Sequence, residues 1–221
     1  MYVINAMPEQ VAKADLDLLS GVETATVGHW RFFGFMNHSI QPLLPKRRIV
    51  GTAVTIAIPG PDSTLLHHIT GMLRPGDVLV VDRMGDDRYA CWGGGVTIAA
   101  KAAGAVAGIV DGPCTDLTEI EDSDFPMWAR GISPITTRLY DLGGGINIPV
   151  SCGGVVVNPG DAILADESGV LVLPHGEVNE VATKALAIQE RGKEREASVK
   201  TGLKLGEVSG ASDKVKARMA V

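Results

Sequence analysis

The sequence has only three cysteines, no long apolar run and no block of basic residues. Cys91, Cys114 and Cys152 cannot all pair with one another and show no CxxC spacing, which favours buried thiols over a disulfide framework or a zinc cluster. No apolar run approaches the ~18 residues that a membrane span needs, and the N-terminus lacks the basic-then-apolar pattern of a signal peptide. We therefore predict a cytoplasmic protein that has no membrane partner.

Charge argues against nucleic acid as a direct ligand. The chain has 221 residues with 20 basic and 26 acidic side chains, a net charge of −6, and its lysines and arginines are dispersed. A nucleic-acid-binding surface usually shows as a basic cluster. The length is sufficient for one domain with a sizeable core, or for one domain with an appended arm.

The first half of the chain alternates strand and helix signals. An amphipathic helix is predicted within residues 9–22, and a helix over 62–73 that begins at Asp62 or Ser63. Apolar or β-branched runs predict strands over 47–58, 77–82, 106–111 and 126–129, and helical patterns fill 62–73, 97–105 and 117–122 between them. Strands that alternate with helices in this way indicate an α/β fold.

The second half follows different patterns. From residue 144, short apolar runs alternate with Gly, Pro, Asn and Asp turns, which predicts short strands packed as an antiparallel or mixed sheet or barrel. A helix follows, with apolar residues on one face near its start and almost only charged residues later. We expect a body over residues 1–175 and a helical tail over 176–221 that packs on a neighbouring subunit.

Three consecutive glycines, Gly93 to Gly95, lie where a loop becomes a helix. Backbone N–H groups without side chains, together with the positive end of a helix, allow an anion to approach closely. The segment from Gly93 to Val96 is therefore a candidate binding site for a carboxylate or phosphate. The alternative is a flexible turn whose glycines only satisfy the backbone geometry.

Asp116 also allows two interpretations. It follows a buried strand, the place where α/β proteins assemble sites, and one carboxylate with several waters suits a hard cation such as Mg²⁺ or Mn²⁺. Asp116 and Glu119 also match a capping box, in which the aspartate accepts a backbone N–H bond and the glutamate reaches back. Among the histidines, the adjacent His67 and His68 point in different directions on a helix and do not form a two-histidine zinc site.

Several segments in order, including "GTAVTI", "LLHHITGMLRPGDVLVVD", "WGGG", "AAKAAGAVAGIVDG", "ARGISP" and "VVVNPGDAILADESGVLVLP", resemble the RraA-like family. That family includes 4-hydroxy-4-methyl-2-oxoglutarate aldolases, which also decarboxylate oxaloacetate, and regulators that inhibit ribonuclease E. The resemblance implies a compact α/β sandwich or swivelling-type β/β/α domain. It also implies a homotrimer or a hexamer, with the site in a cleft between subunits.

In aldolases of the family an Arg-Asp pair follows the Asp-Gly of the strand, where the aspartate binds a divalent metal and the arginine holds the substrate. The resemblance assigns Asp116 as the metal ligand, while Thr115 occupies the position of the arginine. A hydroxyl supplies neither the charge nor the fork geometry of a guanidinium. The arginines that are candidates to replace it are Arg83, Arg88, Arg130 and Arg138.

The resemblance bears on two further positions. Aldolases usually carry an acidic residue after Trp-Gly, where this chain has Gly94, and Asp86 or Asp87 in the preceding loop are possible substitutes. In the charged tail, "GKERE" resembles a segment whose glutamate reaches the metal waters of a neighbouring subunit. The matching residue is Glu194, for which a solvated surface charge is the alternative.

Three functions are compatible with these residues. The first is a metal-dependent lyase acting on a small 2-oxo acid by aldol cleavage or β-decarboxylation, with Asp116 anchoring the metal, Thr115 beside it, and the amides of Gly93 to Val96 holding the substrate carboxylate. The second is a diverged enzyme of the same fold that acts on another small oxygenated acid. The third is a non-catalytic regulator that binds a protein partner.

Overall fold

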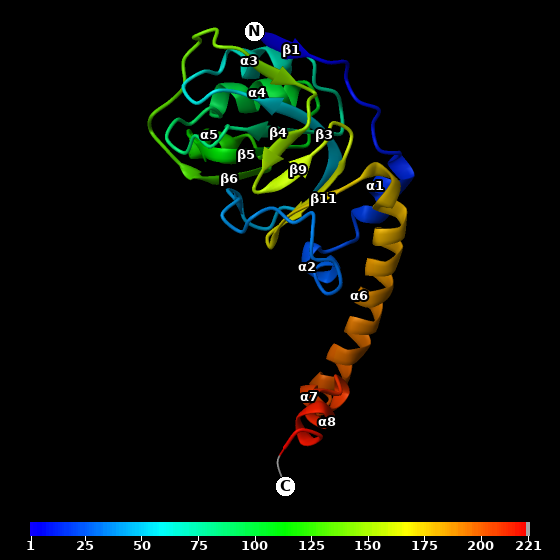
Figure 1. The fold of residues 1–221 in the computed structure, drawn as a ribbon. Helices are drawn as coiled ribbons and strands as arrows, with labels where there is room; N and C mark the ends of the chain where they lie inside the picture. Colours follow the sequence, from blue (N-terminus) through cyan, green and yellow to red (C-terminus); the bar gives the residue numbers. More distant parts are fainter. Residues whose placement is uncertain (220–221) are drawn as a thin grey trace.

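A computed structural model describes residues 1–219 and contains a nine-stranded sheet at its centre (Figure 1). The path through the sheet is β1-β7-β3-β4-β5-β6-β2, and β10 adds to β3 and pairs with β11. The strands are β1 (Tyr2–Ile4), β2 (Gln41–Pro42), β3 (Ile49–Ala57), β4 (Asp77–Asp82), β5 (Ala107–Cys114), β6 (Met127–Ile132), β7 (Gly144–Ile146), β10 (Ala162–Asp166) and β11 (Gly169–Leu173). Because β3, β4, β5 and β6 are parallel neighbours, their carboxyl ends share one edge of the sheet.

Three helices connect these parallel strands and cover one face of the sheet. They are α3 (Thr64–Thr70), α4 (Gly94–Ala102) and α5 (Leu117–Asp122), grouped in the upper left of Figure 1. One buried cluster joins sheet residues such as Val54 and Val81 to helix residues such as Leu66, Ala100 and Ile120. This packing fixes the first turns of the helices at the carboxyl edge.

The opposite face is covered by a small hairpin of β8 (Val150–Cys152) and β9 (Val155–Val157). Alternate residues of the parallel strands, Ala53, Val80 and Ile109 among them, form a second cluster with Val157 and Cys152. Side chains alternate between the two faces of a strand, so a sheet buried on both sides gives these near-continuous apolar runs. The layers are β/β/α, as predicted.

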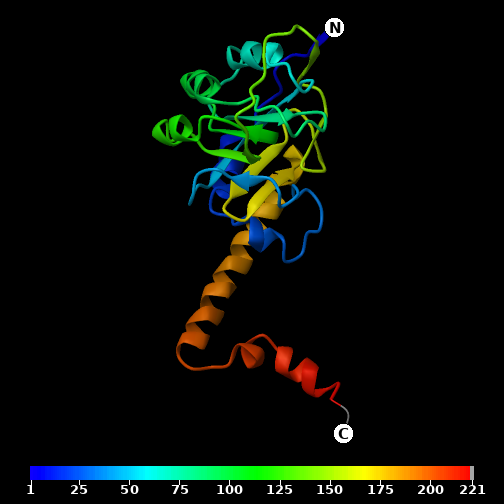
Figure 2. The same cartoon turned by 90° about the vertical axis from the view of Figure 1, so that its left-hand side faces the viewer.

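The hairpin of β10 and β11 packs on helices from both ends of the chain. These are α1 (Lys13–Leu19), α2 (Thr24–Val27) and α6 (Val178–Lys200), which follows a short 3₁₀ turn, η1 (His175–Glu177). The buried residues of α6 end at Ala185, and the rest of the helix leaves the body, followed by α7 (Leu205–Val208) and α8 (Ala211–Lys216) (Figure 2). Packing of this tail on a neighbouring subunit stays a prediction.

Several features were not predicted from the sequence. Strands β1 and β2 and helix α2 were missed. The strands of the second half are divided between the main sheet, in which β7 and β10 pair with β3, and the separate hairpin of β8 and β9. The three cysteines are free and buried, as expected. No helix among the described residues is both long and apolar enough to cross a membrane.

Candidate active site

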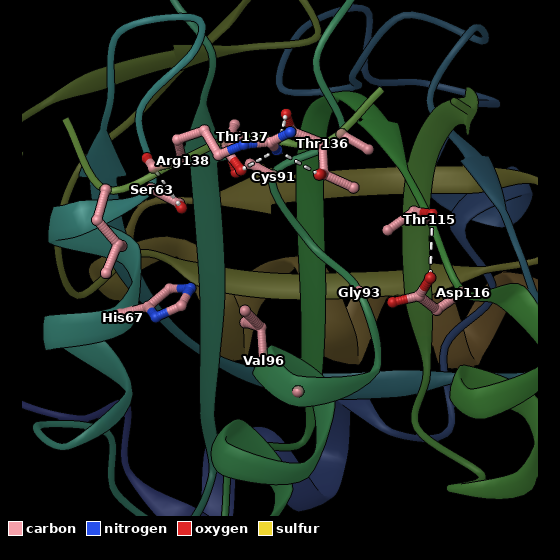
Figure 3. A pocket seen from close by; sticks show the side chains of 13 residues that line it. Ser63, His67, Cys91, Gly93, Val96, Thr115, Asp116, Thr136, Thr137 and Arg138 are labelled. Atoms are coloured by element: carbon pink, nitrogen blue, oxygen red, sulfur yellow. Dashed lines mark hydrogen bonds between the residues drawn. The ribbon is translucent and has the colours of Figure 1, made fainter. Parts of the chain in front are cut away.

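A pocket of about 370 Å³ opens where α4 begins, between the end of β5 and the segment of residues 133–142 (Figure 3). Its lining comes from the residues that follow four neighbouring parallel strands, β3, β4, β5 and β6. The lining residues are Ser63, His67, Ala90, Cys91, Gly93, Gly95, Val96, Thr115, Asp116, Thr136, Thr137, Arg138 and Leu139. Of the predicted site residues, the structure thus brings Gly93, Gly95, Val96, Thr115 and Asp116 together.

Asp116 has a left-handed backbone conformation, with φ 55° and ψ 47°, and its side chain makes no capping hydrogen bond to α5. Its Oδ2 instead accepts the N–H of Gly94 at 3.1 Å. The capping-box interpretation of Asp116 and Glu119 is therefore wrong. Aspartate tolerates this backbone region better than most residues, but the conformation still costs of order 1 kcal/mol and is held by its surroundings.

Thr115 joins the same carboxylate to the glycine segment. Its Oγ1 donates to Asp116 Oδ1 at 3.1 Å, and its backbone N–H donates to the carbonyl of Trp92 at 2.8 Å. Strand β5 reaches this point because it continues past Asp111, through an irregularity between Val110 and Pro113, to Cys114. The strand was predicted to end at Asp111, so the sequence placed its end three residues too early.

The role of Gly94 differs from the prediction for the glycine segment. Only Gly93 lies outside the helix, since α4 begins at Gly94, and Gly94 does not line the pocket. Its N–H is bound to Asp116, so it is not available to a substrate carboxylate. The N–H groups of Gly95 and Val96 have no partner within the described chain and lie at the positive end of α4.

Arg138 is the guanidinium that lines the pocket, and Figure 3 shows it across from Asp116. Its Nη1 donates to Thr136 Oγ1 at 2.9 Å and to the carbonyls of Thr136 and Thr137. The other candidates lie elsewhere: Arg83 is fully buried, and Arg130 forms an ion pair with Asp111 at 2.5 Å. Arg88 is exposed, with its guanidinium carbon 5.5 Å from the centroid of the Tyr89 ring.

Asp62 holds the segment that carries Arg138. Its carboxylate accepts N–H bonds from Thr64 at 2.9 Å, Tyr140 at 3.0 Å and Leu142 at 2.8 Å. Burial alone would raise the pKa of Asp62, but these bonds and one from the Thr64 hydroxyl outweigh it and lower the pKa to about 2. The carboxylate was predicted only to begin α3, whereas it also positions one wall of the pocket.

Two lining residues, His67 and Cys91, have side chains suited to acid, base or nucleophilic chemistry, although the sequence predicted such a role for neither. His67 is exposed and lines the pocket, while the neighbouring His68 does not. Cys91 is buried, which raises the pKa of its thiol to about 11 against the opposing charge of Arg83, so the thiol is protonated at neutral pH. Both residues follow parallel strands whose carboxyl ends share one edge of the sheet. The predicted α/β fold therefore placed them near the site, because the residues after each strand meet at that edge.

The remaining predicted residues lie outside this pocket. Asp86 accepts N–H bonds from Arg88 and Tyr89 in its own turn, and neither Asp86 nor Asp87 is a lining residue. Glu194 is exposed, follows the last buried residue of α6, Ala185, and does not line the pocket of its own chain. Figure 1 shows this part of α6 leaving the body. The proposed reach of Glu194 into a neighbouring subunit stays a prediction.

The donor groups at Asp116 suit a hard cation bound by few protein ligands. No group of three or more His, Cys, Asp or Glu side chains in residues 1–219 has the arrangement of a metal cluster. Asp116 is exposed, and each of its oxygens accepts one hydrogen bond and retains a lone pair. One carboxylate of this kind with several waters is a binding mode of Mg²⁺ and Mn²⁺.

Comparison with known proteins identifies related sequences and folds. The family model described as RraA-like, Aldolase/RraA, matches residues 24–172. A Halalkalibacterium halodurans protein named "Putative 4-hydroxy-4-methyl-2-oxoglutarate aldolase" is 34% identical over 164 residues, which cover 74% of this chain and 78% of that protein. The match to the family model includes Thr115 and Asp116 but ends before Glu194.

Two solved structures share the fold. RraAS2 of Streptomyces coelicolor, described as an unusual member of the RNase ES inhibitor RraA protein family, has a TM-score of 0.76 at 25% identity and covers 85% of this chain and 98% of that one. An uncharacterised protein from Pseudomonas syringae pv. tomato has a TM-score of 0.78 at 22% identity, with 94% of this chain and 99% of that one covered. The second likeness shows the fold over nearly the whole chain.

Proposed function

The chain belongs to the RraA-like, Aldolase/RraA family, and we propose that it is a lyase that cleaves a carbon–carbon bond in a small 2-oxo acid with a divalent cation held by Asp116. The observation that carries the proposal is the placement of this carboxylate. It is exposed in a pocket beside the first turn of α4, and two hydrogen bonds fix its orientation. Mg²⁺ or Mn²⁺ would neutralise the negative charge that develops on the C2 oxygen of the substrate.

The substrate carboxylate would bind opposite Asp116. The N–H groups of Gly95 and Val96, which have no acceptor within residues 1–219, would bind it at the positive end of α4, and Arg138 adds a full positive charge on the other wall. This set of donors differs from the one predicted from the sequence, because the Gly94 amide is not among them. Arg138 supplies the positive charge that Thr115 lacks at the position where aldolases of the family carry an arginine. Thr115 instead orients Asp116 through its hydroxyl.

The lining favours chemistry through an enolate over covalent catalysis. The Cys91 thiol is protonated at neutral pH because burial raises its pKa to about 11, so it is a poor nucleophile. In β-decarboxylation the bond between C3 and C4 breaks, carbon dioxide leaves, the electron pair moves to the C2 oxygen, and C3 later takes a proton from water. That reaction needs no protein base.

Retro-aldol cleavage has one further requirement. A 4-hydroxy-2-oxo acid must lose its hydroxyl proton as the bond between C3 and C4 breaks, which calls for a proton acceptor in the pocket. His67 is the imidazole that lines it and is the candidate for this role. Activity on oxaloacetate therefore tests enolate stabilisation alone, whereas activity on a 4-hydroxy-2-oxo acid also tests the proton acceptor.

The experiment measures pyruvate released from oxaloacetate and from a 4-hydroxy-2-oxo diacid, with Mg²⁺ or Mn²⁺ and after chelation. The proposal requires release above the rate of the free metal, and its loss on chelation. Release from oxaloacetate alone identifies a decarboxylase without an effective base. No release from either acid contradicts the proposal and favours the alternatives, a diverged enzyme for another oxygenated acid or a regulator that binds a protein.

A further inference from the structure

Glu119 on α5 occupies the space that a side chain at Gly94 would fill. A Cβ atom built on Gly94 would lie 1.6 Å from Glu119 Oε2, 2.7 Å from Cδ and 3.0 Å from Cβ. No side chain fits at position 94 while Glu119 keeps this orientation. Glycine at position 94 is therefore needed for a second reason besides exposing the backbone at the helix start. The absence of its side chain leaves space for the Glu119 carboxylate of the neighbouring helix.

Gly93 has the same relationship to Asp116. A Cβ atom on Gly93 would lie 2.4 Å from Asp116 Oδ2, and the N–H of Gly94 donates to that same oxygen at 3.1 Å. Two consecutive glycines are thus each covered by one carboxylate, and both carboxylates come from the segment that begins α5. They lie together beside the first turn of α4.

The Glu119 carboxylate has no protein cation to balance it. Within the described chain it makes no side-chain hydrogen bond and no ion pair, although Lys101 on α4 is close enough to α5 to donate to the carbonyl of Ser123. Two carboxylates near one another repel, and a divalent cation between or beside them relieves the repulsion. The arrangement is the one expected if the second carboxylate acts on a cation.

We propose that Glu119 is a second carboxylate of the cation site at Asp116 and that glycine at position 94 is what admits it. This inference rests on the proposed function, since it assumes that Asp116 binds the cation. It assigns the acidic group that the Trp-Gly-Gly segment lacks to a residue of α5, 25 positions further along the chain. Glu119 lies outside the pocket lining, so it acts on the cation or on its water shell from the side of α5.

The test measures Mn²⁺ affinity by the electron paramagnetic resonance signal of free Mn²⁺, without substrate. Glu119→Gln removes the charge and keeps the shape, and Gly94→Ala leaves the charge but forces the flexible carboxylate aside. Each is expected to weaken Mn²⁺ binding by roughly three- to thirtyfold, the range for losing one nearby charge interaction near a protein surface. The double variant should bind no more weakly than Glu119→Gln, because both changes remove the same interaction.

Matched controls separate a local effect from bulk charge. Glu121→Gln changes the net charge equally on the same exposed helix and should leave the affinity unchanged. Circular dichroism confirms that each variant is folded. Wild-type affinity in either Glu119→Gln or Gly94→Ala, with binding lost in Asp116→Asn, overturns the inference and leaves the proposed function standing. Wild-type affinity in Asp116→Asn overturns both.

Discussion

The backbone N–H of Gly94 donates to Oδ2 of Asp116 at 3.1 Å, and this bond joins the start of α4 to the end of β5. It connects two segments that follow neighbouring parallel strands. It also determines which groups remain for a ligand: the Gly94 amide is occupied, whereas the amides of Gly95 and Val96 have no acceptor in the part of the chain that the structure describes. The carboxylate is consequently fixed before any cation or substrate binds, which lowers the cost of ordering the site.

The close approach of Asp116 to Gly93 predicts that alanine at position 93 lowers activity, whereas alanine at position 95 raises stability. Gly93→Ala places a Cβ atom 2.4 Å from Asp116 Oδ2 and 2.9 Å from Thr115 Cγ2, so it should displace the carboxylate and lower kcat/KM about tenfold or more. Gly95→Ala meets nothing within 4 Å and should raise the stability by up to about 1 kcal/mol, since alanine favours helix. Urea unfolding and steady-state kinetics check the pair. Equal activity in the two variants would contradict the placement of Asp116.

Thr115 is predicted to limit the lyase because it supplies no positive charge. Thr115→Arg should raise kcat/KM for oxaloacetate about tenfold or more, since a guanidinium beside the C2 oxygen or carboxylate forms charge-assisted hydrogen bonds. Thr115→Val is the control, because it removes the hydroxyl that donates to Asp116 and should lower activity. A rate in Thr115→Arg at or below that of Thr115→Val would refute this account of the threonine.

Arg138 is predicted to bind the substrate carboxylate. Arg138→Met should raise KM by roughly ten- to a hundredfold, as expected for loss of a hydrogen-bonded charge pair, with a smaller change in kcat. Arg88→Met removes an exposed arginine that does not line the pocket and should leave KM unchanged. The prediction fails if both variants have the same KM.

Asp62 is predicted to make stability depend on pH in the acid range. Its folded pKa of about 2 is below the ordinary 3.8, so the ionised form is stabilised by folding. The contribution, at most about 2 kcal/mol, is present above pH 4 and is lost as the pH falls from about 4 to 2. Urea unfolding across this range should show a weaker pH dependence in Asp62→Asn, along with lower stability at neutral pH. An unchanged slope would contradict the role of this carboxylate.

The sequence predicted the α/β body and the four strands of its first half because these depend on local patterns, and the resemblance to the family placed Gly93 and Asp116 in one site. One wall of the site depends on a contact remote in sequence. Asp62 binds the backbone of Leu142, 80 residues away. No local pattern reports such a contact, so the placement of Arg138 in the pocket was not predictable.

Local rules failed at Asp116 itself. The spacing to Glu119 fits a capping box, but the carboxylate is drawn to Gly94 on another helix and the backbone turns left-handed. A tertiary hydrogen bond to a charged acceptor contributes about as much as a cap and replaced it here. The strand end was misplaced for a related reason, because the irregularity between Val110 and Pro113 lets β5 continue through a Gly-Pro pair.

The most direct test of the central claim compares Mg²⁺-dependent pyruvate release from oxaloacetate by the native protein and by Asp116→Asn. Asparagine tolerates the left-handed backbone and its amide oxygen can still accept the N–H of Gly94, so the change removes the charge with little change of shape. We predict a loss of about a hundredfold or more after subtraction of the free-metal rate. An unchanged rate in Asp116→Asn would contradict the claim that this carboxylate holds the catalytic cation.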